Sequence, residues 1–147
     1  MKTKLEEAIE SLSAADDANL YARLGAYSIE FPQSPHKFAE PRAAISLDVK
    51  TAGALSASIE LGQRILKAWN RSLYDLTCAA ADPQAKKTIV DALHLKSADG
   101  IAAAITGILI STFSVGPAIA TIVGVLLGRV LLPAAGRELC AFWKEKL

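Results

Sequence analysis

A long stretch without charge limits what this chain can fold into. Residues 100–128 contain no Asp, Glu, Lys, Arg or His, and their polar side chains are all hydroxyls. A helix rises about 1.5 Å per residue, so a continuous helix over this stretch would extend about 43 Å, and the hydrocarbon core of a bilayer is only about 30 Å thick. The stretch is therefore long enough to cross a membrane.

A glycine-proline pair, Gly116 and Pro117, interrupts the stretch near its middle. Proline lacks an N–H and clashes with the preceding helical turn, whereas glycine tolerates the dihedral angles of a chain reversal. Two structures fit this pattern: a single span kinked at Pro117, or a hairpin of two helices over residues 97–114 and 117–132. Each arm of the hairpin is shorter than the hydrocarbon core, which favours a core hairpin in a soluble bundle.

The first arm of this hairpin has no charged face. A surface helix of a small globular protein normally carries charges opposite its apolar stripe. Apart from Asp99 near its start, the first arm offers only Ser and Thr as polar side chains, whose hydroxyls can bond back to their own helix. A chain of 147 residues has little material with which to surround two such helices. We therefore expect lipid or other subunits to cover them, with a monomeric soluble core as the alternative.

Small residues within the stretch predict close packing of helices. Gly124 and Gly128 form a G-x-x-x-G pattern, which lets helix backbones approach in membranes and also in soluble hairpins. Near the C-terminus, a tryptophan close to two lysines is typical of a membrane interface. We expect a membrane or oligomer interface to include Ile108, Phe113, Gly116, Pro117, Ile122, Gly124, Gly128 and Trp143.

The remainder of the chain predicts amphipathic helices, so the fold class is all-α. Thr3, Asp82 and Ser97 are expected N-caps, each placed just before a run with helical spacing of apolar residues. Residues 28–48 hold three prolines and predict a loop, with a brief strand at 43–49 and a docking place for a partner protein. The expected organisation is a small helical bundle.

The bundle divides into two portions along the chain. Residues 1–96 form an amphipathic helical portion that includes the proline-rich loop, and residues 97–147 form the hydrophobic hairpin with a short amphipathic C-terminal helix. The formal net charge is +1, without a clustered basic face, so we expect no nucleic-acid binding.

The two cysteines, Cys78 and Cys140, lie far apart without a C-x-x-C motif, so we expect no disulfide framework and a reducing compartment. The N-terminus lacks the apolar segment of a secretory signal, which predicts cytoplasmic synthesis. The expected location is then a membrane, such as the inner membrane, or the soluble cytoplasm.

Motifs for catalysis are absent from the sequence. It contains no glycine-rich phosphate loop, no nucleophile elbow and no histidine-cysteine spacing for zinc. Cys78, Asp91 and His94 are residue types that could form a catalytic set, but nothing in the sequence brings Cys78 near the other two. We expect no enzymatic activity, no cofactor, no metal and no small-molecule substrate.

Taken together, these features favour a non-enzymatic protein whose hairpin inserts into a membrane or drives oligomerisation. Its expected partners are membrane lipid or further copies of itself. The plan resembles that of bacterial pore-forming effectors, in which apolar helices stay covered until they are released; the similarity is one of plan and not of motif. The alternative is a soluble interaction or assembly subunit that uses the hairpin as core or subunit interface and binds a partner protein.

Overall fold

The computed structural model describes residues 3–30, 39, 52–80, 82–134 and 138–147. These residues form α-helices and no strand, which confirms the all-α prediction. The helices are α1 (Lys4–Ser13), α2 (Asp17–Glu30), α4 (Ala52–Tyr74), α5 (Pro83–His94), α6 (Ala98–Phe113), α7 (Pro117–Leu131) and α8 (Leu139–Glu145). A π-helical turn, η2 (Asp75–Ala79), extends α4, and a 3-10 turn, η3 (Leu132–Ala134), extends α7.

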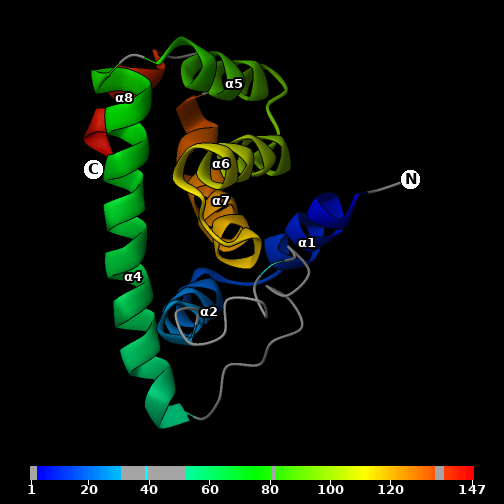
Figure 1. Ribbon diagram of the computed structural model, residues 1–147, viewed down its shortest axis with the longest axis vertical. Coiled ribbons are helices and arrows are strands. Elements are labelled where there is room, and N and C mark those ends of the chain that lie inside the picture. The colour runs from blue at the N-terminus through cyan, green and yellow to red at the C-terminus, as the bar shows by residue number, and fades with distance from the viewer. Residues whose placement is uncertain (1–2, 31–38, 40–51, 81, 135–137) are drawn as a thin grey trace.

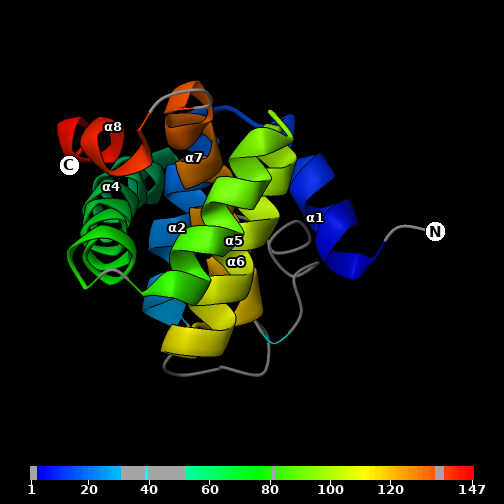
Figure 2. The same cartoon turned by 90° about the horizontal axis from the view of Figure 1, so that it is seen from above.

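The helices surround α7. The longest helix, α4, runs along the long axis of the molecule, with α2 packed across it (Figure 1). The α6–α7 hairpin lies between α4 on one side and α1 on the other, and α5 packs on α6 (Figure 2). As a result α7 contacts α1, α2, α4 and α6.

The core is built around this central helix. Every residue of α7 from Ala118 to Gly128 is buried. Ile101, Ile105 and Leu109 of α6 pack into the same core, which also includes residues of α1, α2, α4, α5 and α8. The expectation that so short a chain cannot enclose its apolar helices is therefore wrong for α7, because the amphipathic helices α1, α2 and α4 and the other arm of the hairpin, α6, all pack against it.

The helix starts follow the predicted caps. Thr3, Asp82 and Ser97 each accept a backbone N–H from two or three residues later, at 3.0–3.2 Å. At the start of α8, the Glu138 carboxylate accepts the Ala141 N–H at 2.5 Å, and this hydrogen bond holds the pKa of Glu138 below its usual value. Local hydrogen bonding thus fixes where these helices begin.

The predicted proline-rich loop begins later than expected. Residues 28–30 belong to α2. The first proline after the start of this helix is Pro32, and a proline disfavours helical geometry only at the residue directly before it, so residues 28–30 can remain helical. The rest of the predicted loop, including the expected strand at 43–49, lies outside the described residues apart from Ala39.

Against expectation, Cys78 and Cys140 form a disulfide, with their Cα atoms 5.7 Å apart. The bond joins η2 to α8 across a sequence separation of 62, so it leaves the chain without a free thiol. The expectation of no disulfide was wrong because spacing in sequence carries no sign of a contact that only the packing of α8 creates.

Candidate functional site

The apolar hairpin is the candidate site, and a tight turn separates its two helices. Ser114 ends α6 in the left-handed conformation, with φ at 55°, and the Val115 N–H donates to the Leu109 carbonyl at 3.1 Å. Gly116 is the N-cap of α7, and Pro117 is its first residue. The hairpin prediction is confirmed, and the alternative of one span kinked at Pro117 is wrong.

Two glycines of α7 bring the hairpin helices into backbone contact. A Cβ added to Gly124 would lie 2.2 Å from Thr106 Oγ1 and 2.6 Å from the Ala102 carbonyl oxygen. One added to Gly128 would lie 2.8 Å from the Ala98 carbonyl oxygen. Real Cβ atoms essentially never come this close, so the close contact predicted from the G-x-x-x-G pattern is confirmed.

Three hydroxyl groups of the hairpin are hydrogen-bonded within the hairpin itself. The buried Thr106 hydroxyl is 2.7 Å from the Ala102 carbonyl in its own helix and 3.3 Å from the Ala120 carbonyl in α7. Ser111 and Thr121 donate to the carbonyl four residues earlier, at 2.8 and 2.6 Å. This back-bonding leaves these three side chains with little need for water.

The outer face of α6 is open to solvent and uncharged. It consists of the exposed Gly107, Ser111 and Thr112 and the half-buried Ala103 and Ala104. A groove of about 460 Å³ separates it from the start of α5, and another of about 550 Å³ separates it from α1. We call these five residues the outer face of α6.

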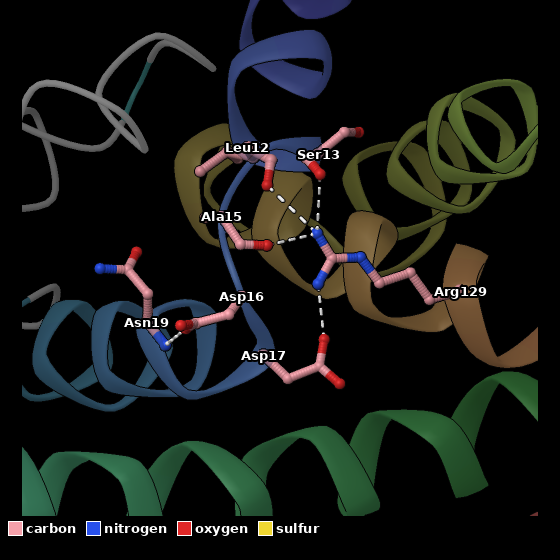
Figure 3. Close-up of polar contacts among 7 residues, drawn as sticks. All are labelled: Leu12, Ser13, Ala15, Asp16, Asp17, Asn19 and Arg129. Atoms are coloured by element: carbon pink, nitrogen blue, oxygen red, sulfur yellow. Dashed lines mark hydrogen bonds and ion pairs between the residues drawn. The ribbon is translucent and has the colours of Figure 1, made fainter.

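At the base of the hairpin, Arg129 joins α7 to the link between α1 and α2 (Figure 3). One guanidinium nitrogen lies 2.5 Å from the Asp17 carboxylate, and the other donates to the Ser13 and Ala15 carbonyls at 3.1 and 2.6 Å, with a longer contact to Leu12 at 3.4 Å. The fork of a guanidinium suits the carbonyls that a helix end leaves without partners.

In the sequence, Arg129 stands out only as the first charged residue after the uncharged residues 100–128. Its partner Asp17 also affects a neighbour: burial raises the pKa of Tyr21, and the Asp17 carboxylate raises it further. No local pattern signals that one arginine will bind four groups of α1 and α2, because its partners lie more than a hundred residues away.

The other residues expected at an interface are covered by the chain itself. Phe113 is half-buried and packs edge-on against Trp69 of α4, with 5.3 Å between ring centroids. Trp143 is fully buried, and its indole N–H donates to the Asn70 side-chain oxygen at 2.5 Å. Pro117 is half-buried, and the remaining members of the set are buried: Ile108, Gly116, Ile122, Gly124 and Gly128. Contact of these residues with lipid or a second copy stays a prediction.

The disulfide removes the nucleophile from the catalytic set that the sequence offers. Cys78 cannot act as a nucleophile beside Asp91 and His94 while its sulfur is bonded to Cys140. Within the part of the chain that the structure describes, no group of three or more His, Cys, Asp or Glu side chains is placed to hold a metal.

Among the described residues, one helical segment has the length and apolarity of a membrane span. Pro117–Ala134 covers 18 residues with a mean hydropathy of 1.8, and 72% of it is buried in the bundle. The core helix of a soluble protein has the same features. Comparison with known proteins adds no assignment, since no family model, curated protein or solved structure matches the chain.

Proposed function

We propose that the chain is a non-enzymatic helical protein whose α6–α7 hairpin leaves the bundle and inserts into a membrane. The outer face of α6 is the observation that carries this proposal. It faces solvent, yet residues 100–113 include no charge. By contrast, the solvent-facing sides of the other amphipathic helices are charged, with Glu6 and Glu10 on α1 and Lys86 and Lys87 on α5. Exposure to water alone does not account for a helix surface without charge over residues 100–113, whereas a lipid environment does.

The internal bonding of the hairpin supports its transfer as a unit. Helices satisfy their own backbone groups, and the Thr106, Ser111 and Thr121 hydroxyls are bonded within the hairpin. The side-chain hydrogen bonds that release would break are those of Arg129 with α1, α2 and their link and that of Asp99 with Ser13. The span Pro117–Ala134 is about 27 Å long, close to the thickness of the hydrocarbon core. Arg129, near the end of α7, could keep its charge at the membrane surface by extending its side chain.

A charge placed on the outer face of α6 tests insertion without disturbing the folded bundle. A Cβ at Gly107 meets nothing within 4 Å, so Gly107→Asp is compatible with the bundle. In a bilayer the same Asp costs about 2.5–3.5 kcal/mol. Gln63→Asp, on the exposed side of α4, is the matched control.

The measurement is flotation with vesicles of phosphatidylcholine and phosphatidylglycerol, at neutral and at acidic pH. We expect the wild type and Gln63→Asp to float with the vesicles, and Gly107→Asp to bind at least about tenfold more weakly. Two results would show that the hairpin does not insert. One is a wild type that floats at neither pH, and the other is Gly107→Asp binding the vesicles as strongly as the wild type.

The enclosure of α7 favours a second candidate, a soluble interaction or assembly subunit. A helix surrounded by α1, α2, α4 and α6 is suited to be a permanent core. In that case the hairpin stays in place, and a second copy or a partner protein covers the outer face of α6. Sedimentation without lipid separates the two candidates: a wild-type oligomer that Gly107→Asp converts to a monomer supports the assembly subunit.

A further inference from the structure

The C-terminal helix α8 packs on the C-terminal end of α4 and also contacts η3. Cys140 is bonded to Cys78 of η2, and the Trp143 indole donates to Asn70. The Asn70 side chain in turn donates to the Lys146 carbonyl at 3.2 Å, and Tyr74 packs edge-on against Trp143 with 5.9 Å between ring centroids. We call the site formed by Asn70, Tyr74 and Cys78 the α8 seat.

By itself α8 is too short to persist as a helix. It has seven residues, whereas isolated helices below about 12–15 residues are marginal in water. Its order therefore depends on contacts with the seat, and the disulfide is the only covalent one. Leu139, Phe142 and Trp143 of α8 are buried in the bundle, so undocking would expose an apolar surface.

The turn of α4 that holds Cys78 has two unfavourable local features. It is π-helical, with the Ala80 N–H donating to the Asp75 carbonyl five residues earlier. The Thr77 hydroxyl in the same turn is fully buried and has no hydrogen-bond partner among the described residues. Both features cost free energy, so this turn has reason to rearrange once the bond to α8 is broken.

We propose that the Cys78–Cys140 disulfide is a redox-sensitive clasp, and that its reduction releases α8 from the α8 seat while the rest of the bundle stays folded. A dithiol reductant breaks the S–S bond by transferring two electrons. Two protons complete the thiols of Cys78 and Cys140, and the reductant becomes a disulfide. Both cysteines are half-buried, so a small thiol has access to them.

The contacts that hold the hairpin do not pass through the clasp. Arg129 binds α1 and α2, and Gly124 and Gly128 pack against α6, so none of these contacts includes a residue of α8. Residues 135–137 still connect α8 to η3 after reduction, so the released helix stays near its seat and docks again on reoxidation. This inference is independent of membrane insertion.

Hydrogen exchange of the full chain, followed by mass spectrometry, tests the clasp. The oxidised protein is compared with protein reduced by dithiothreitol, and alkylation counts the thiols. On reduction we expect exchange in residues 138–147 to accelerate by roughly tenfold or more, exchange in residues 118–131 to stay unchanged, and reoxidation to reverse the effect. Cys140→Ser should behave like the reduced wild type without reductant.

Three results would overturn the clasp. The first is unchanged exchange in residues 138–147 after both thiols are titrated. The second is equal acceleration in α7, which would make the disulfide a global staple of the fold. The third is the detection of two free thiols in protein exposed to a mild oxidant, which would mean that the disulfide does not form. If Cys140→Ser does not fold, the reduced wild type alone decides the question.

Discussion

The hairpin α6–α7 and the pair α2–α4 both pack through glycines that bring two helix backbones into contact, although the hairpin is apolar and the pair is amphipathic. In the second pair, a Cβ on Gly25 would lie 2.1 Å from the Ser58 carbonyl oxygen, and one on Gly62 would lie 2.0 Å from the Tyr21 carbonyl oxygen. These contacts are as close as those of Gly124. The amphipathic pair, α2 and α4, is thus packed at least as tightly as the uncharged hairpin.

This comparison shows that the G-x-x-x-G pattern is evidence of close packing and not of a membrane. What distinguishes the hairpin is the uncharged outer face of α6, and any argument for lipid rests on that face. The two pairs also differ in what opposes each glycine. Gly25 and Gly62 face backbone, whereas Gly124 also faces the Thr106 side chain, which can be shortened by substitution.

The largest effect is expected at the α2–α4 crossing. In Gly62→Ala the new methyl group meets a backbone carbonyl that cannot move without separating the helices. We expect a loss of about 3 kcal/mol or more in the free energy of unfolding, measured by urea denaturation. A loss below about 1 kcal/mol would show that the two helices adjust easily.

Gly124→Ala should destabilise the hairpin somewhat less, by about 2–3 kcal/mol. Because one of the two obstructing groups is the Thr106 hydroxyl, Thr106→Ala in the same chain should recover part of the loss. A double-mutant cycle measures this coupling. Strictly additive losses would mean that the Ala102 carbonyl alone opposes the methyl group.

Arg129→Ala should destabilise the bundle by about 2 kcal/mol, because it leaves carbonyls at the end of α1 without partners. Arg129→Lys should restore only part of the loss, since an ammonium lacks the guanidinium fork. Arg71→Ala is the control: Arg71 pairs with Asp75 on the surface, their side chains are 66% and 52% exposed, and we expect a change below about 0.5 kcal/mol. Equal losses for Arg129 and Arg71 would contradict the anchoring role.

The smallest expected effect is an increase in stability. Gly107→Ala places a methyl group in open space on the outer face of α6, so only the backbone preference of the helix changes. We expect a gain of about 0.5–1 kcal/mol in the free energy of unfolding. A loss would indicate that this face is covered in solution by another copy.

Much of the fold follows from local patterns in the sequence. The caps at Asp82 and Ser97 and the reversal at Gly116 depend on residues within a few positions of each other. The close approach of α6 and α7 was predictable too, since a short turn between two apolar helices leaves them little choice but to pack together. Gly25 and Gly62 gave no such signal, because residues 31–51 lie between their helices and the sequence does not say which helix pairs with which.

By itself, the sequence determined the helical class, the helix starts and the hairpin, because propensity, capping and proline geometry act over a few residues. Only the tertiary structure decided that α7 is enclosed, that Arg129 binds the end of α1, that Trp143 bonds to Asn70, and that the two cysteines join. The contacts of Arg129, Trp143 and the cysteines link residues 62 to 117 positions apart. They arise from how the amphipathic helices bury their apolar faces together, and no local pattern records that arrangement.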